Sequence, residues 1–404
     1  MTTPRRVAVT GLGLICALGN TVAESWDALR QGRCGIRPIE SADTSTLKFR
    51  NGAEVRAYDP LQHFDPSRLE LLDRFAQLLI VATREAVTDS GLSFAGELGE
   101  RTAIVTGTGA GGFITADAQF SRAASNCRMH PFAVPRIMAS AGASYISMEF
   151  GISGPTYTVS TACSSANHAI GQAFWMVRSG QVDAAIAGGS EAPFSLGILR
   201  GWDALRVVSP DTCRPFARER RGMVLGEGAG VLVLEPLDAA RTRGAHVYAE
   251  IAGFGMSSDA HHITQPSLDG PVRAMRAALR DAGIEPARIG YINAHGTGTP
   301  LNDPLEARAI RAVYGDSADH VAVSSTKSAH GHALGAAGAI EAVATVLALH
   351  DRLLPPTVNF TERDPECDLD IIANQARPAA VEYAMSNSFA FGGLNAVLTL
   401  RAIW

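Results

Sequence analysis

The chain has 404 residues, of which 46% are hydrophobic and 19% charged, and its formal net charge is −5. This balance is typical of a globular protein with a large buried core and excludes an intrinsically disordered chain. The acidic balance disfavours nucleic acid as a partner, and the absence of a run of about 18 apolar residues predicts no membrane span.

The cysteine spacing and the amino-terminal residues indicate the cellular compartment. The six cysteines show no C-x-x-C spacing, which argues against a disulfide framework and against a zinc site. The first residues, MTTPRRVAVTGLG, lack the apolar core of a signal peptide. We therefore expect a cytoplasmic protein.

Short apolar runs alternate with longer segments whose apolar residues recur every three or four positions. The pattern predicts strands over 6–13, 102–109, 184–192 and 230–237, and helices over 67–91, 271–283 and 303–315. Strands that are apolar throughout are typical of buried sheets, so the sequence predicts an α/β protein.

The sequence also contains a weak internal repeat. VTDSGL at 87–92 precedes a strand and the turn G-T-G at 107–109, and LRDAGI at 279–284 precedes a strand and the turn G-T-G at 296–298. The repeat predicts two similar halves, with the second opening near residue 245. The alternative is coincidence, because D-x-G-[LI] commonly ends a helix.

Cys163 follows the apolar segment YTVST and precedes small residues that open a helix from Ser164. A sulfur at the amino end of a helix faces unpaired N–H groups and the helix dipole, which favour a thiolate. Cys163 is therefore a candidate nucleophile. The alternative is a buried cysteine that serves only as a small apolar side chain.

Two further segments carry candidate partners for the thiol. His295 ends an apolar strand directly before the turn GTGTP, where side chains leave the sheet edge. Lys327, His330 and His332 lie in TKSAHGH, ahead of an Ala/Gly-rich helix over 333–349. A zinc site at His330 and His332 is disfavoured because no further ligand lies at fitting spacing. An oxidoreductase is disfavoured because the glycine-rich segments lack the full dinucleotide-binding pattern.

These residues lie in four motifs, GPTYTVSTACSSANHAI, NAHGTGTPLNDPLEA, SSTKSAHGHALGAAGAIEA and NSFAFGGLNA. Through them the chain resembles, nearly end to end, the elongating β-ketoacyl-acyl-carrier-protein synthases among the thiolase-like condensing enzymes. The resemblance implies an α/β fold of two similar halves in α-β-α-β-α layers. We expect the halves to span residues 1–245, with the cysteine, and 246–404, with the two histidines.

The resemblance also implies the reaction and the residues that perform it. An acyl chain on the cysteine condenses with malonyl-acyl-carrier protein, which loses carbon dioxide, and a β-ketoacyl thioester two carbons longer results. The implied catalytic residues are Cys163, His295, His332, Lys327 and Glu341; Phe391 gates the site and forms the oxyanion hole with the Cys163 N–H; Thr297 and Thr299 bind the pantetheine arm.

We expect no metal and no cofactor, because the substrates arrive on the 4′-phosphopantetheine arm of acyl carrier protein. A carrier protein is acidic, so its docking site should be basic. Arg206 matches a docking arginine of the relatives, and Arg68 and Arg128 are candidate companions. The alternative for all three is an ordinary solvated arginine.

Several positions depart from fatty-acid relatives. Ala110 and Ala133 replace bulkier residues of the acyl pocket, Trp202 stands where phenylalanine is more usual, and Ala390 replaces a glycine of the gating loop. Smaller side chains enlarge a pocket. We therefore expect specialised fatty acid or type II polyketide biosynthesis, with a polyene-like chain, and keep housekeeping fatty-acid elongation as the alternative.

Other members of the fold are disfavoured by particular residues. A thiolase would carry a second cysteine near the carboxyl end, where this chain reads SFAFGGLN, and a starter-type synthase would pair the cysteine with histidine and asparagine. A chain-length factor lacks the nucleophile, so Cys163 argues against that non-catalytic role. The sequence leaves open a homodimer or a heterodimer with a chain-length-factor-like subunit.

Overall fold

The computed structural model describes residues 4–404, and its eleven-stranded mixed sheet runs through the whole molecule. In spatial order the strands are β12 (Asp370–Ile371), β10 (Ala322–Ser324), β9 (Ile289–Asn293), β14 (Tyr383–Ala390), β15 (Leu394–Ala402), β8 (Ala249–Ser258), β1 (Val7–Cys16), β7 (Gly228–Pro236), β6 (Ala184–Glu191), β4 (Thr102–Gly107) and β5 (Thr156–Val159). Two small hairpins pair β2 (Arg37–Pro38) with β3 (Asn51–Gly52) and β11 (Leu353–Leu354) with β13 (Arg377–Pro378).

The sheet consists of two halves with one topology. The order β5-β4-β6-β7-β1 in the first half matches β10-β9-β14-β15-β8 in the second. In each half the first three strands of that order are parallel and the next two pairings are antiparallel. The halves join where Val7–Val9 of β1 pairs with Ala249–Ile251 of β8. The predicted duplication is confirmed, whereas the boundary at 245/246 stays a prediction.

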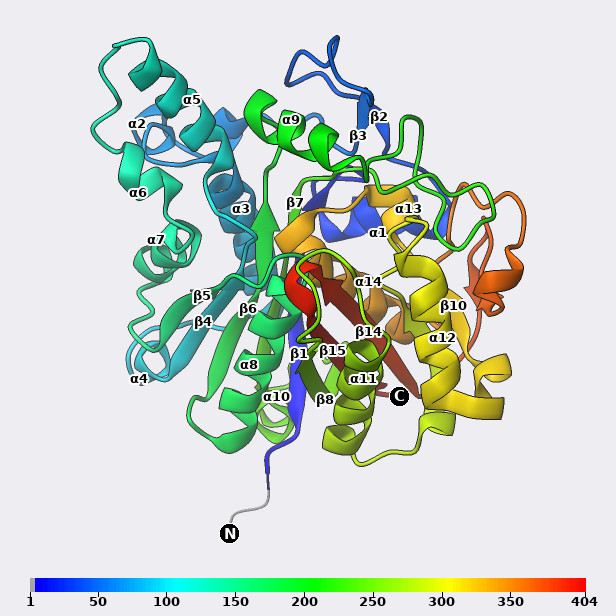
Figure 1. Cartoon of the computed structure of the whole chain (residues 1–404). Helices are drawn as coiled ribbons and strands as arrows, with labels where there is room; N and C mark the ends of the chain where they lie inside the picture. Colours follow the sequence, from blue (N-terminus) through cyan, green and yellow to red (C-terminus); the bar gives the residue numbers. More distant parts are fainter. Residues whose placement is uncertain (1–3) are drawn as a thin grey trace.

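Helices lie in three layers around the two halves (Figure 1). In the central layer, α8 (Ser165–Ser179) and α14 (Ala337–Asp351) contact each other and strands of both halves. On the outside, α3 (Arg74–Ser90) and α7 (Ala141–Phe150) cover the first half, and α11 (Asp269–Ala282), with α12 (Asn302–Tyr314) beside it, covers the second. This arrangement confirms the expected α-β-α-β-α layering.

The remaining helices lie at the periphery of these layers or in loops. They are α1 (Val22–Arg30), α2 (Pro66–Leu69), α4 (Glu97–Glu100), α5 (Phe113–Ala124), α6 (Ala133–Ile137), α9 (Leu196–Leu205), α10 (Leu237–Thr242) and α13 (Lys327–His330).

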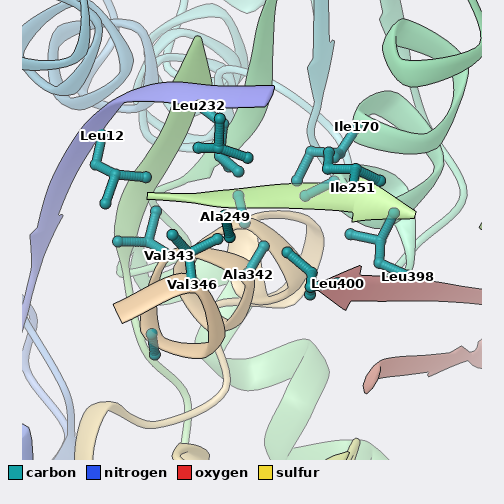
Figure 2. Close-up of a cluster of buried hydrophobic side chains, with 14 of the residues drawn as sticks. Leu12, Ile170, Leu232, Ala249, Ile251, Ala342, Val343, Val346, Leu398 and Leu400 are labelled. Atoms are coloured by element: carbon teal, nitrogen blue, oxygen red, sulfur yellow. The ribbon is translucent and has the colours of Figure 1, made fainter. Parts of the chain in front are cut away.

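The central helix α14 is held by apolar contacts with strands of both halves of the sheet. In Figure 2, Val343 and Val346 of α14 gather with Leu12 of β1 and Leu400 of β15 in one apolar cluster. The stretch Leu334–Asp351 is long and apolar enough to cross a membrane, which the sequence analysis did not anticipate, yet 89% of it is buried inside the protein. It is a core helix, and its apolar character follows from contact with both halves of the sheet.

The helix predicted over 67–91 is in fact two helices, α2 and α3. Between them Asp73 takes the N-cap position of α3, where its side chain accepts a hydrogen bond from Phe75 N at 3.1 Å. The other oxygen of Asp73 accepts from Thr115 N at 2.7 Å. Apolar residues recur at helical spacing on both sides of Asp73, so the sequence did not predict that a new helix begins there. The glycines of the internal repeat, Gly91 and Gly283, end α3 and α11 with φ of 65° and 67°.

The packing of α8 against β4 should be sensitive to a side chain added at Gly107. A Cβ at Gly107 would lie 2.5 Å from Ala166 N and from Ser165 C in α8. We predict that Gly107→Val lowers the free energy of unfolding by about 1–3 kcal/mol, measured by urea denaturation, because the helix must shift to admit the side chain. As a control, Gly201→Ala in α9, where a Cβ meets no described atom within 4 Å, should be neutral or slightly stabilising. Equal stability of the Gly107→Val and wild-type proteins contradicts this packing.

Candidate active site

A short link between β5 and α8 positions Cys163. Ala162 adopts a left-handed conformation with φ of 50°, and α8 begins at Ser165 with Ser164 as its N-cap residue. The Ser165 hydroxyl fixes the link, since it donates to Ala162 O at 2.7 Å and accepts from Thr161 N at 2.9 Å. The predicted position of Cys163, directly before a helix, is confirmed.

Backbone N–H groups near Cys163 favour its thiolate, as expected, but burial of the sulfur has the larger and opposite effect on its pKa. Burial raises the pKa of Cys163 to about 11, and the nearby positive charge of Lys327 and the backbone N–H groups of Phe391 and of Cys163 itself lower it only in part. Loss of water around the sulfur therefore outweighs the helix end. At neutral pH the resting side chain is a thiol with two N–H groups directed at its sulfur.

His295 and the glycine turn after it are held by two carboxylates near the start of α12. Glu306 accepts from His295 N at 2.8 Å and from Gly296 N at 2.7 Å, and Asp303 accepts from Gly298 N at 3.2 Å. Both carboxylates are fully buried. Neither carboxylate was predicted from the sequence, where the available signal was two acidic residues three positions apart after a glycine turn.

His332 follows α13 and a left-handed glycine, Gly331, with φ of 70°. Its backbone is held to the first half of the chain, because His332 N donates to Val224 O at 2.7 Å and His332 O accepts from Gly226 N at 2.9 Å. The imidazole rings of His295 and His332 lie edge to face, with centroids 5.4 Å apart and planes at 83°.

A buried ion pair lies beside the histidines. The Lys327 ammonium donates a hydrogen bond to Glu341 Oε1, and both side chains are completely buried. Burial raises the pKa of Glu341 to about 7 in spite of the attraction of Lys327. Burial, and then the charge of Lys327, lower the pKa of His295 and of His332 well below the usual range. Both imidazoles are therefore neutral at physiological pH.

One cavity of about 500 Å³ brings together three of the predicted catalytic residues. Cys163, His295 and His332 all line it. Its wall also includes Thr297, Thr299, Trp202, Arg206 and Phe391. The hydroxyl oxygens of Thr297 and Thr299 are 2.9 Å apart, and the rings of Trp202 and Phe391 stack with centroids 6.2 Å apart. The cavity thus runs from a thiol with two imidazoles to an arginine at its rim.

Besides the buried pair Lys327 and Glu341, four predicted site residues do not line the cavity. Ala110 is exposed in the loop after β4, and Ala133 is buried in α6; neither lines the cavity. Arg68 forms an ion pair with Glu149 rather than facing the cavity, and Arg128 lies exposed before α6. Of the three docking candidates, Arg206 alone is at the cavity. Within residues 4–404 no group of three His, Cys, Asp or Glu side chains is arranged to hold a metal ion.

The duplicated layered fold, with a cysteine and two histidines at one cavity, defines a thiolase-like condensing enzyme. Comparison with known families agrees. Residues 4–240 match the family described as Beta-ketoacyl synthase, N-terminal domain, and residues 248–361 match Beta-ketoacyl synthase, C-terminal domain. The chain belongs to the β-ketoacyl synthase family.

Similar proteins extend over the full chain. Nodulation protein E of Rhizobium sp. (strain N33) is 45% identical over 99% of this chain and 100% of its own. The 3-oxoacyl-[acyl-carrier-protein] synthase 2 of Staphylococcus aureus (strain N315) is 41% identical over 99% of each chain. Among solved structures, "The ishigamide ketosynthase/chain length factor" has 40% identity and a TM-score of 0.94, over 99% of this chain and 100% of that one.

The identification made from the four sequence motifs is confirmed. The protein is a β-ketoacyl synthase, an acyltransferase that condenses an acyl chain with a malonyl thioester. Carbon dioxide leaves, and the product is a β-ketoacyl thioester two carbons longer.

The reactivity of Cys163 should follow its raised pKa. Because the thiolate fraction grows tenfold per pH unit below the pKa, we predict that alkylation of Cys163 by iodoacetamide accelerates about tenfold per unit from pH 7 to 9.5. The rate is measured by mass spectrometry of the peptide that contains Cys163. Lys327→Met removes a charge that lowers this pKa, so alkylation should be slower at every pH. A rate that levels off below pH 9 contradicts the buried thiol.

Proposed function

We propose that Cys163 carries the acyl chain and that His295 and His332 act on the malonyl group. The observation that carries this proposal is the meeting of these three side chains at one cavity, with both imidazoles neutral. Lys327 and Glu341 support the site as a buried charge pair. Phe391 contributes its N–H to the oxyanion hole and its ring to the gate.

In the first stage the Cys163 sulfur attacks the carbonyl carbon of an acyl thioester. The thiol proton moves to one of the neutral imidazoles, because a thiol with a pKa near 11 needs a base. The N–H groups of Cys163 and Phe391 hydrogen-bond to the oxygen that becomes negative. The carbon–sulfur bond to pantetheine then breaks, and the departing sulfur takes up the proton.

In the second stage a malonyl thioester occupies the same cavity. Its bond to the carboxylate breaks, carbon dioxide leaves, and the electron pair delocalises onto the thioester oxygen as an enolate. Neutral His295 and His332 can each donate an N–H to that oxygen. The enolate carbon attacks the acyl carbonyl and the bond to Cys163 breaks. The sulfur leaves as a thiolate and takes a proton from water, because its first proton departed with the pantetheine thiol. Each electron pair is supplied by the Cys163 sulfur or by the malonyl group, so the proposed route uses no metal and no cofactor.

The substrates are proposed to arrive on acyl carrier protein. Thr297 and Thr299 line the cavity, where their hydroxyl groups can bond a pantetheine arm. Arg206 lies at the rim and ends α9 in a left-handed conformation that directs the chain away from the helix. A positive rim suits an acidic carrier. Arg68 and Arg128 remain lesser docking candidates, since neither lines the cavity.

We propose a specialised fatty acid or type II polyketide pathway. Trp202 gives the cavity a flat aromatic wall stacked on Phe391, which suits a rigid conjugated chain such as a polyene. Ala110 and Ala133, expected in the acyl pocket, do not line this cavity and give the proposal no support. Housekeeping fatty-acid elongation is the alternative, because a 3-oxoacyl-[acyl-carrier-protein] synthase is 41% identical to this chain. A non-catalytic chain-length factor is disfavoured by Cys163.

We propose a cytoplasmic dimer, with a second copy or a chain-length-factor-like subunit as partner. Within the described chain β5 pairs only with β4 and ends the sheet, so its outer edge is free for another strand. Exposed apolar side chains lie in the neighbouring segment 113–150, namely Phe120, Phe132, Val134, Met138 and Met148. An apolar surface beside a free strand edge is typical of a protein–protein interface.

The nucleophile is tested by intact-mass analysis after incubation with acyl carrier protein charged with an acyl chain. We predict an acyl adduct on the wild type and none on Cys163→Ala. Cys127→Ala, which removes an exposed cysteine outside the cavity, is the matched control and should form the adduct. Adducts on Cys163→Ala, or none on any protein, contradict the proposed role.

The same assay tests the pathway. A preference for a conjugated chain over a saturated chain of equal length is expected, and equal preference would count against the specialised pathway.

A further inference from the structure

Glu191 is a fully buried carboxylate that the proposed mechanism does not use. It is the last residue of β6, in the first half of the molecule. Glu191 Oε1 accepts from the Thr108 hydroxyl at 3.0 Å, and Oε2 accepts from Gly109 N at 2.5 Å and from Gly335 N at 2.9 Å. One side chain therefore bonds two loops that belong to different halves of the fold.

The first of these loops is attached to the segment that carries Cys163. The Ser160 hydroxyl donates to Gly109 O at 2.8 Å. The Ser165 hydroxyl, whose shorter hydrogen bond is to Ala162 O, also lies 3.2 Å from Thr108 O. Ser160 and Ser165 flank Cys163 on either side. Displacement of the loop at 108–109 would therefore move the link that presents the thiol.

The second loop is the turn that follows His332. Gly335 lies three residues after His332, and a Cβ there would lie 2.2 Å from Gly109 N and 2.6 Å from Glu191 Oε2. The two loops thus meet backbone to backbone, with the carboxylate as their shared acceptor. Each of its three hydrogen-bond partners is an N–H or O–H donor, which is the environment that an ionised carboxylate requires.

Glu191 also acts on the thiol through its charge. Two charged side chains shift the pKa of Cys163: Lys327 lowers it and Glu191 raises it. Burial raises the pKa of Glu191 itself to about 7, so the carboxylate is largely ionised at the higher pH where the thiol titrates. Removal of this negative charge should therefore make the thiol more acidic.

We propose that Glu191 is a positioning residue for the condensation, which ties the loop beside Cys163 to the turn beside His332 and so holds the acyl-bearing sulfur in register with the imidazoles. The inference rests on the proposed function of those residues. Glu191 touches no substrate in this account, and its effect is on the alignment of two groups from opposite halves.

Three variants test the proposal. Glu191→Gln keeps the shape of the side chain but removes the charge and turns an amide toward donors. Glu191→Asp keeps the charge but shortens the reach. Glu235→Gln is the matched control: Glu235 is a buried carboxylate on β7 that accepts from Thr10 at 2.6 Å, outside the cavity.

Steady-state kinetics and Cys163 alkylation are measured on each folded protein. For Glu191→Gln we expect kcat of condensation to fall about 10- to 100-fold with KM for both carrier substrates within about twofold, because misalignment slows chemistry rather than docking. The midpoint of the alkylation profile should move to lower pH. Glu191→Asp should lower kcat while leaving that midpoint near the wild-type value, and Glu235→Gln should change neither.

Wild-type kcat and an unchanged alkylation midpoint in Glu191→Gln would overturn the proposal, as would equal losses in Glu235→Gln. If Glu191→Gln does not fold, Glu191→Asp decides, because wild-type kcat in that variant also overturns it. Failure of the proposed function is distinguishable: the wild type itself would then form no acyl adduct at Cys163.

Discussion

The structure depends on the packing of α8 and α14 between the two halves of the sheet. Both helices are in contact with strands from each half, so their amino ends are fixed relative to each other. Glycine at 107 and the Ala/Gly-rich start of α14 permit this approach, because larger side chains would collide with backbone. Cys163 lies directly before α8, and His332 lies in the turn that leads to α14. The same packing that completes the core therefore assembles the thiol and the imidazoles.

Burial then sets the chemistry of these groups. Two effects favour the neutral form of each imidazole: burial, which removes water, and the positive charge of Lys327. The same burial keeps Cys163 a thiol until a substrate carbonyl is present. Lys327 is tolerated in the interior because Glu341 is its ion-pair partner, and removal of one member of such a pair typically costs about 3–5 kcal/mol. The charge of Lys327 thus lowers the pKa of all three groups at the cavity.

Much of this could be predicted from sequence. Apolar runs and two glycine-ended helices indicated the duplicated α/β fold, and the strand–Cys–helix and H-G-T-G-T patterns indicated the site. Two features of the site could not be predicted from the sequence. The pKa of Cys163 depends on how deeply neighbouring elements cover the sulfur, which local sequence does not encode. Glu191 and Glu306 resemble ordinary acidic residues until the fold brings backbone N–H groups from distant loops to their oxygens. Ala133, chosen by resemblance, lies outside the cavity.

The central claim is that two neutral imidazoles face a protonated thiol. It is tested most directly by ¹⁵N NMR of ring-labelled histidine, with His295 and His332 assigned by single substitution. The account predicts that both rings stay neutral from pH 8 down to pH 6, and that Lys327→Met raises the pKa of both. Titration of either wild-type ring with a midpoint near the ordinary histidine value of about 6.5 would contradict it.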